Sequence, residues 1–587
     1  MWPRLRGALI LSGMKNKSLC SWVAALLTGL LGPVAHAAAP APVAAEHGMV
    51  VTAQAYATHV GVEVLKKGGN AVDAAVAVGY ALAVVYPAAG NLGGGGFITL
   101  QLADGRKTFI DFRETAPLAA TATMYLDKDG KVVPELSTRG YLAVGVPGTV
   151  AGLEYAREKY GTRPRAELIA PAIRLAERGF VLRPGDTEML REATEDFRKD
   201  APSAAIFLRQ GEPFEDGATL VQRDLARTLR NVSKRGAAGF YRGETAAALV
   251  AASQRGGGIL TQADLDAYKV RELAPLECDY RGFRIVSAPP PSSGGVALCE
   301  MLNVLEGYPL SELGWGSARA VHFEIEAMRH AYVDRNNLLG DPDFVRNPIA
   351  ALLAKDYASA VRARIDPQHA GDSTRLRAGL APQEGTHTTH YSIADGAGNA
   401  IAVTYTLNDW FGARVTAQGT GVLLNDEMDD FTAKPGVPNM YGLVQGEANK
   451  IEPGKRPLSS MTPTIVQRDG KPWLIVGTPG GSRIITAVLH TVLNVIDYGM
   501  DIQEAVAAPR VHQQWMPETT FVEPYALSPD TRAILAGMGH KLTVPAPENH
   551  LAAILIGSPA LNAKPVDGKR FYGALDPRRN TGLALGY

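Results

Sequence analysis

A threonine-rich segment near residue 390 constrains the fold of this chain more than any other stretch, because it encodes a tight hairpin. Two alternating stretches rich in Thr, Tyr, Val and Ile, at residues 386–394 and 400–408, flank a turn at residues 395–399 that reads Asp-Gly-Ala-Gly-Asn. Alternating β-branched and aromatic residues are typical of strands, and Gly, Asp and Asn are typical of hairpin loops. The segment therefore predicts two adjacent antiparallel strands.

The register of this hairpin gathers polar side chains at one end. A turn centred on Ala397 predicts the pairs Ala394 with Ala400, His390 with Thr404, and Thr388 with Thr406. Side chains directly opposite each other on one face are close enough to form hydrogen bonds, and Asn408 lies on the same face two residues further on. A slip of one residue would undo this arrangement.

Thr388 is the candidate nucleophile at this end of the hairpin. A threonine hydroxyl needs a base beside it, and the free amine of a chain-terminal threonine, with a pKa of about 7.7–8.0, can be that base. Because Thr388 lies within the chain, this chemistry requires cleavage between His387 and Thr388. Taken alone, the hairpin favours a plain polar-faced strand, since threonine is common in strands.

Three downstream motifs accompany the hairpin, at residues 423–431, 455–464 and 477–483. They read Leu-Leu-Asn-Asp-Glu-Met-Asp-Asp-Phe, Lys-Arg-Pro-Leu-Ser-Ser-Met-Thr-Pro-Thr and Gly-Thr-Pro-Gly-Gly-Ser-Arg. Together with Thr-Thr-His-Tyr-Ser at 388–392, they closely resemble motifs of the γ-glutamyltransferase (γ-glutamyl transpeptidase) family of N-terminal-nucleophile hydrolases. The resemblance covers nearly the whole chain after about residue 45.

The resemblance implies an α+β fold, the four-layer αββα sandwich of N-terminal-nucleophile hydrolases. It also implies self-cleavage ahead of Thr388, into a large chain of residues 38–387 and a small chain of residues 388–587. The two chains would form one compact domain. The family chemistry implies no cofactor and no metal.

The same resemblance implies a role for each catalytic residue. Thr388 would be the nucleophile, its freed amine the base, and Thr406 its hydrogen-bond partner. Gly480 and Gly481 would offer backbone N–H groups to the developing oxyanion, and such donors are each worth roughly 3 kcal/mol. On its own, the glycine pair would indicate only a turn. Tyr441, in the loop at 435–446, would belong to a lid that excludes water.

A γ-glutamyl donor also has two charged ends to be held. The resemblance implies two groups of residues for them: Arg113, Ser459 and Ser460 for the α-carboxylate, and Asn408, Glu427 and Asp430 for the α-ammonium. A planar guanidinium suits a carboxylate because it can form two parallel hydrogen bonds. Glu427 stands where some family members carry Gln, a difference that should tune ammonium binding rather than abolish it.

The N-terminus has the pattern of a secretory signal. A basic region precedes an apolar stretch at 21–34, which is short for a membrane span, and Ala35-His36-Ala37 supplies a cleavage site. Residues 1–37 are therefore a predicted signal peptide, and the mature protein is expected in the periplasm or outside the cell. An uncleaved anchor is the alternative, and Met14 is a second candidate start.

Composition and motif spacing argue against several other functions. The 59 Lys and Arg balance the 59 Asp and Glu, so no basic excess indicates nucleic acid. The glycine-rich stretch at 90–96 lacks the lysine of a phosphate loop and favours a close-packed turn. No Cys/His cluster has zinc spacing, and His322 and His330 fit helix packing. Cys278 and Cys299 leave open both a disulfide and two buried thiols.

The predicted activity is transfer of the γ-glutamyl group of glutathione or a related donor to water, an amino acid or a peptide. Two alternatives remain. A glutaryl or cephalosporin-type acylase of the same fold takes a side chain that lacks the α-amino group, so it has less use for Asp430. An inactive binding protein of the periplasm would not need the nucleophile, the glycine pair or the carboxylate grip.

Overall fold

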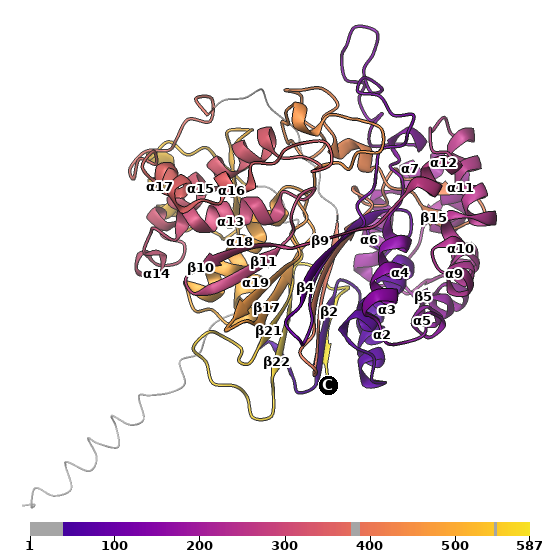
Figure 1. Cartoon of the computed structure of the whole chain (residues 1–587), viewed down its shortest axis with the longest axis horizontal. Helices are drawn as coiled ribbons and strands as arrows, with labels where there is room; N and C mark the ends of the chain where they lie inside the picture. The colour runs from indigo at the N-terminus through magenta and orange to yellow at the C-terminus, as the bar shows by residue number, and fades with distance from the viewer. Residues whose placement is uncertain (1–38, 377–387, 545–548) are drawn as a thin grey trace, which may run out of the picture. The chain divides into compact units, whose positions relative to one another are not determined.

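The computed structural model describes residues 39–376, 388–544 and 549–587 (Figure 1). The predicted signal peptide and His387 lie outside the described residues. Within the described ranges, no helix is both long and apolar enough to cross a membrane.

Two seven-stranded sheets form the centre of the compact unit that spans residues 41–587. The first has the order β1 (Val43–Ala45), β22 (Phe571–Leu575), β21 (Ala552–Ile556), β17 (Lys471–Gly477), β16 (Thr464–Arg468), β11 (Phe283–Ser287) and β10 (Leu276–Tyr280). The second has the order β23 (Leu583–Gly586), β2 (Gly48–Thr52), β12 (Thr389–Asp395), β13 (Ala400–Thr406), β3 (Gly95–Gln101), β4 (Lys107–Asp111) and β9 (Arg271–Leu273). Both sheets thus combine strands from either side of residue 387.

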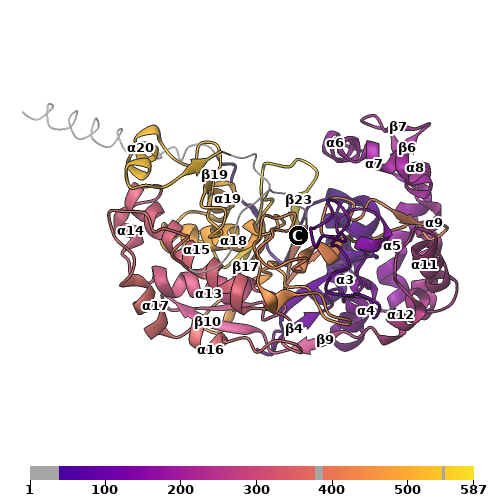
Figure 2. The same ribbon diagram turned by 90° about the horizontal axis from the view of Figure 1, so that it is seen from above.

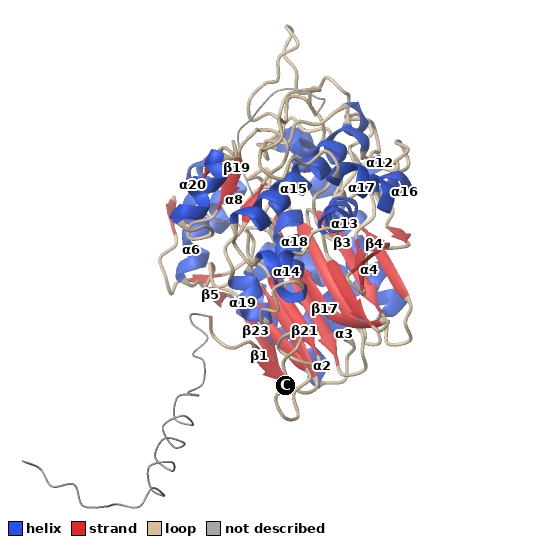
Figure 3. Cartoon of the chain, turned by 90° about the vertical axis from the view of Figure 1, so that its left-hand side faces the viewer, coloured by secondary structure: helices blue, strands red, loops and turns tan. Residues whose placement is uncertain are grey.

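The sheets face each other across an apolar layer, and helices cover their outer faces (Figures 2 and 3). Small and branched residues, such as Ala402 and Ile475, fill the inner layer. Helices α2 (Ala55–Lys66), α3 (Ala71–Val85) and α4 (Thr149–Tyr160) pack on the sheet that contains β12. Helices α13 (Gly294–Leu305) and α18 (Arg483–Ile496) pack on the other sheet, and α15 (Ala318–Leu338) packs on α13. The predicted four-layer αββα sandwich is confirmed.

A mostly helical region follows α4. It contains α5 (Arg165–Arg178), α6 (Pro184–Glu192), α7 (Thr194–Lys199), α8 (Ala201–Phe207), α9 (Arg223–Arg235), α10 (Ala238–Tyr241), α11 (Gly243–Arg255) and α12 (Gln262–Ala267). Later short helices are α14 (Leu310–Leu313), α16 (Ile349–Leu352), α17 (Lys355–Arg362), α19 (Ile502–Ala507) and α20 (Pro529–Gly537). Small ladders join β5 (Phe180–Val181) to β8 (Thr219–Leu220), β6 (Leu208–Arg209) to β7 (Glu212–Pro213), β14 (Thr416–Ala417) to β15 (Val422–Leu423), and β18 (Val511–His512) to β19 (Thr520–Val522) and β20 (Leu542–Thr543).

The hairpin of β12 and β13 has the predicted register. Ala394 pairs with Ala400 and His390 with Thr404, and the ladder begins at Thr389 opposite Tyr405. Thr388 directly precedes this first pair, and Thr406 is the last residue of β13. The two threonines therefore sit at the same end of the hairpin, as the turn at 395–399 requires.

The glycine-rich stretch at 90–96 is a close-packed turn that leads into β3, as predicted. A Cβ on Gly94 would lie 1.9 Å from the carbonyl oxygen of Thr406, and one on Gly96 would lie 2.4 Å from that of Thr404. Only glycine lets backbone approach backbone so closely. The stretch therefore supports the end of β13 on which Thr406 sits.

The structure settles the question of the two cysteines. Cys278 of β10 and Cys299 of α13 form a disulfide with an S–S distance of 1.99 Å. The bond links the edge of one sheet to the helix that covers it. Such a bond is expected where the compartment is oxidising. The two helix histidines pack as predicted: His322 and His330 are both buried in α15, and His322 contacts His540 and the carbonyl oxygen of Asp366.

A buried carboxyl group in α13 predicts how stability depends on pH. Burial raises the pKa of Glu300 well above its usual value, and the carboxylate of Asp334 raises it further. Because the folded state holds this proton more tightly than the unfolded state does, the stabilisation is complete below the ordinary glutamate pKa of about 4.3 and is lost as the pH rises through the folded-state value.

Glu300→Gln should therefore raise the free energy of unfolding more at pH 8 than at pH 5, by on the order of 1 kcal/mol. Urea unfolding at the two pH values measures the difference. Glu306→Gln, at the end of the same helix, is the control, because the Lys355 hydrogen bond lowers the pKa of Glu306 against the effect of its burial. An equal change at both pH values for Glu300→Gln would contradict the assignment.

Candidate functional site

One small cavity brings together nearly all the predicted site residues. Its lining includes Thr388, Thr406, Arg113, Asn408, Glu427, Asp430, Ser459, Ser460, Tyr441 and Gly481. These residues come from segments up to about 370 positions apart in the sequence. The cavity volume is about 20 Å³, which is room for roughly one water molecule. The site is therefore assembled but narrow, and a ligand larger than a water molecule needs a lining residue to move.

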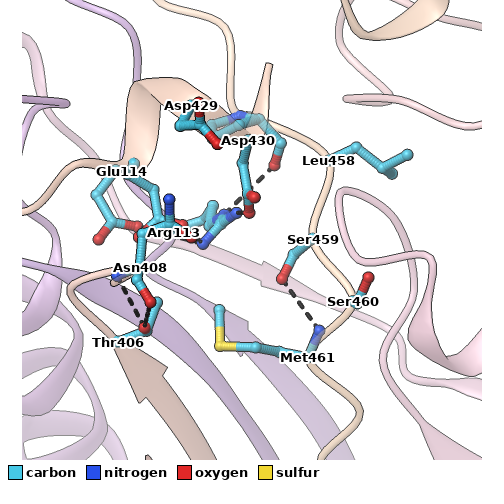
Figure 4. Close-up of polar contacts among 12 residues, drawn as sticks. Arg113, Glu114, Thr406, Asn408, Asp429, Asp430, Leu458, Ser459, Ser460 and Met461 are labelled. Carbon is cyan, nitrogen blue, oxygen red and sulfur yellow. Dashed lines mark hydrogen bonds and ion pairs between the residues drawn. The ribbon is translucent and has the colours of Figure 1, made fainter. Parts of the chain in front are cut away.

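Thr388 is buried at the head of β12, with 3% of its surface exposed. Thr406 lies on the same cavity wall because the hairpin register places the two threonines together. The hydroxyl oxygen of Thr406 accepts the backbone N–H of Asn408 at 2.8 Å (Figure 4). Asn408 has a positive φ of 81°, so the chain turns sharply after β13 and directs the amide toward the cavity.

Arg113 follows β4 and is almost completely buried. Its two terminal nitrogens donate to Glu427 and to Asp430, and its Nε donates to the carbonyl oxygen of Pro457 at 3.3 Å. Figure 4 shows the guanidinium of Arg113 beside the carboxylate of Asp430. The carboxylate of Asp111 accepts its backbone N–H at 3.0 Å. The residues predicted for opposite ends of the substrate thus pair with each other in the closed site. A zwitterionic ligand would replace this internal pairing: its carboxylate would pair with Arg113, and its ammonium would pair with Glu427 and Asp430.

The site holds more carboxyl groups than cations around Arg113. Burial raises the pKa of Glu427 well above its usual value and raises that of Asp430, although the Arg113 charge opposes both shifts. Burial likewise raises the pKa of Glu114 to about 7. An arriving ammonium group would relieve this crowding of negative charge, because it favours the ionised form of nearby carboxylates.

Ser459 and Ser460 lie against the turn at 288–295. Ser459 donates its backbone N–H to the carbonyl oxygen of Pro291 at 2.8 Å and accepts from the hydroxyl of Ser293 at 2.7 Å. The Ser459 hydroxyl oxygen accepts the N–H of Met461 at 3.1 Å (Figure 4). The turn therefore fixes the backbone from which both serines reach the cavity.

Tyr441 forms part of the cavity wall. Its hydroxyl donates to Asn408, through both the backbone carbonyl at 2.9 Å and the side-chain oxygen. Its ring covers Gly481 so closely that a Cβ there would lie 2.4 Å from the ring. Tyr441 lies in the loop at 435–446, and the role of this loop as a lid stays a prediction.

Gly480 and Gly481 precede α18 and have φ values of +129° and +51°. Such values suit glycine and strain other residues. Gly481 lines the cavity, whereas Gly480 is not among the lining residues and faces Asn549, whose Nδ2 would lie 2.1 Å from an added Cβ. The roles of both backbone N–H groups at an oxyanion remain predictions.

One residue behind this cavity was not predicted from the sequence. Arg335, in the last turns of α15, donates to the hydroxyl oxygen of Ser460 at 2.9 Å. The helix was predictable from its periodicity, but the inward direction of Arg335 depends on how α15 packs against the segment at 455–464. A basic residue near the C-terminus of a helix more often interacts with the helix dipole, so its position in the sequence does not indicate a site.

The architecture and the threonine at the head of a buried strand define an N-terminal-nucleophile hydrolase. The family model described as gamma-glutamyltranspeptidase matches residues 57–586, and the chain belongs to this family.

Two similar relatives are glutathione hydrolase proenzymes. The protein of Pseudomonas sp. (strain A14) is 70% identical over 94% of this chain and 96% of its own length. The protein of Escherichia coli (strain K12) is 49% identical over 93% of each. Among solved structures, cephalosporin acylase from Bacillus halodurans matches with a TM-score of 0.82 and 27% identity, over 95% of this chain and 99% of that chain.

Proposed function

We propose that this protein is a self-processing γ-glutamyltransferase and glutathione hydrolase in which Thr388 carries the γ-glutamyl group. The observation that supports this most is the single cavity that joins Thr388 to a guanidinium, two serines, an amide and two carboxyl groups. Such a set complements a γ-glutamyl group, which has one α-carboxylate, one α-ammonium and one reactive carbonyl. The names of the similar relatives agree with this activity.

Maturation is the first use of the threonine. The Thr388 hydroxyl attacks the carbonyl carbon of His387, and the amide C–N bond breaks as the amine of Thr388 takes up a proton. The ester that results is hydrolysed by water, which leaves a carboxylate on His387 and restores the hydroxyl. The products are a large chain, 38–387, and a small chain, 388–587, which remain together because both contribute strands to each sheet.

Turnover is the second use. The free amine of Thr388 accepts the hydroxyl proton while the oxygen attacks the γ-carbonyl of the donor, and Thr406 orients the hydroxyl. The N–H groups of Gly480 and Gly481 stabilise the oxyanion. The leaving amine departs with the proton, and water or the amine of an amino acid or peptide then releases the γ-glutamyl group from the ester.

The donor is held at its charged ends. Arg113, Ser459 and Ser460 bind the α-carboxylate, and Asn408, Glu427 and Asp430 bind the α-ammonium. Tyr441 opens to admit the donor and closes to exclude water. After removal of residues 1–37, the pair of chains acts in the periplasm or outside the cell, an environment that suits the Cys278–Cys299 disulfide.

An acylase that prefers glutaryl donors is the second candidate, because a cephalosporin acylase shares the fold. The buried carboxyl groups of Glu427 and Asp430 weigh against it, since a glutaryl side chain offers them no ammonium. An inactive binding protein would not need Thr388 at the head of a buried strand.

Release of p-nitroaniline from γ-glutamyl-p-nitroanilide, with and without glycylglycine, tests the proposal. Release that the acceptor stimulates identifies a transferase, and release that ignores the acceptor identifies a hydrolase. A protein that cleaves glutaryl-p-nitroanilide and leaves the γ-glutamyl donor intact would be the acylase. A cleaved protein that acts on neither donor would contradict both enzymatic assignments.

A further inference from the structure

Arg335 is a buried cation with an unusual set of partners. Only 1% of its side chain is exposed. Its guanidinium donates to neutral oxygens alone: Ser293 Oγ at 3.0 Å, Asn336 Oδ1 at 2.8 Å, Gln445 Oε1 at 3.4 Å and Ser460 Oγ at 2.9 Å. Within the described ranges no carboxylate lies at ion-pair distance from it. Buried charges are normally paired, because an uncompensated one is costly.

Arg335 stays charged in the folded protein, and the nearby acid is taken by another cation. Burial lowers the pKa of Arg335 to about 10, so the group stays protonated at neutral pH. The acid that interacts with it across the site is Asp430, and the carboxylate of Asp430 is already bound by Arg113. The site therefore contains a second guanidinium whose countercharge is not supplied by its own contacts.

Ser460 connects this cation to the substrate cavity. Its hydroxyl oxygen accepts from Arg335, and among the described residues its hydrogen has no acceptor. Because Ser460 lines the cavity, the remaining direction for that hydrogen is toward the ligand. Ser293, the other serine held by Arg335, also binds the carbonyl oxygen of Ser459. The guanidinium of Arg335 thus holds Ser460 directly and the backbone of Ser459 through Ser293.

We propose that Arg335 is a positioning residue for the donor's α-carboxylate, which it serves by holding Ser460 with its hydroxyl aimed into the cavity and by placing a positive charge behind it. The proposal rests on the function proposed above, because it takes the ligand to be a γ-glutamyl donor. It adds a second cation to Arg113. The two arginines approach the carboxylate position from different walls, one from the end of β4 and one from α15.

Three p-nitroanilide donors separate this role from a structural one. The γ-glutamyl donor has both charged groups, the glutaryl donor lacks the ammonium, and the 4-aminobutanoyl donor lacks the carboxylate. In Arg335→Met we expect kcat/KM to fall by about 10- to 100-fold for the γ-glutamyl donor, mainly through KM. The glutaryl donor should lose a similar factor, and the 4-aminobutanoyl donor should change by less than about threefold.

Arg329→Met is the matched control. Arg329 is also buried in α15, but it pairs with Glu326 and Glu518 away from the cavity. Loss of the Arg329 side chain should change kcat/KM by the same factor for all three donors. An equal loss for all three donors in Arg335→Met would overturn the proposal and leave Arg335 a packing residue. Failure of the wild-type protein on the γ-glutamyl donor would instead remove the function on which the proposal rests.

A second set of variants covers the case in which Arg335→Met does not mature. Arg335→Lys keeps the charge but cannot span Ser293 and Ser460 together. If Arg335 acts through Ser460, the effects of Arg335→Lys and Ser460→Ala on kcat/KM for the γ-glutamyl donor should overlap. The fold-loss in kcat/KM of the double variant should then be clearly smaller than the product of the two single fold-losses. Independent, multiplicative losses would contradict the proposed action through Ser460.

Discussion

Thr388→Ala should yield a single uncut chain with no measurable turnover of a γ-glutamyl donor. The substitution removes the only atom proposed to attack both the His387 carbonyl and the substrate. Loss of a nucleophile that is itself the acyl carrier typically costs roughly 10⁴-fold or more in rate. Denaturing gel electrophoresis and mass spectrometry of the purified variant measure the first effect, and p-nitroaniline release measures the second.

Two neighbouring substitutions serve as controls. Thr388→Ser keeps a hydroxyl and should still cleave and turn over the donor, at reduced rate. Thr389→Ala removes a buried hydroxyl that has no hydrogen-bond partner among the described residues, so cleavage and activity should both persist. A cut between residues 387 and 388 in Thr388→Ala would show that another group performs maturation.

Asp430→Asn should remove most of the preference for donors that carry an α-ammonium. The carboxylate of Asp430 lies at the cavity beside Arg113, and a charge-assisted hydrogen bond to an ammonium contributes roughly 1.5–3 kcal/mol. We expect kcat/KM for γ-glutamyl-p-nitroanilide to fall by about 10²-fold. Activity on glutaryl-p-nitroanilide should change much less, because that donor has no ammonium to lose. Steady-state kinetics on both donors measure the ratio.

Asp429→Asn is the matched control for this prediction. Asp429 is buried next to Asp430 in the same short 3₁₀ helix (Glu427–Asp430), but it accepts from Ser137 and from the backbone of Met440 and does not line the cavity. Its substitution should leave the ratio between the two donors unchanged. A ratio that moves equally in both variants would mean that Asp430 acts on the shape of the site rather than on the ammonium.

Local patterns in the sequence were enough to predict the hairpin. The turn at 395–399 fixes its own register because Asp395 accepts the backbone N–H groups of Ala397, Gly398 and Asn399. The glycines at 93–96 were likewise interpretable, since the stretch lacks the lysine of a phosphate loop and close packing was the physical alternative. In both cases the determining contacts lie within a few residues or follow from the absence of a side chain.

Contacts between segments far apart in the chain could not be predicted from local sequence patterns. Cys278 and Cys299 are 21 positions apart, and nothing local says whether a strand and a helix bring their sulfur atoms together. The family motifs identified the charged residues of the cavity but not that Arg113 would pair with Glu427 and Asp430 when the cavity is closed. Arg335 was missed because its partners come from the segments at 288–295 and 455–464. These segments contact α15 only through the tertiary packing of the whole sandwich, which no local pattern reports.

The most direct test of the central claim is mass spectrometry of wild-type protein quenched in acid while it turns over γ-glutamyl-p-nitroanilide. We expect two chains that meet at Thr388, with a fraction of the small chain heavier by one γ-glutamyl group and peptide mapping that locates this group on Thr388. An uncut chain that turns over the donor, or a γ-glutamyl group on any other residue, would contradict the assignment of Thr388 as the nucleophile.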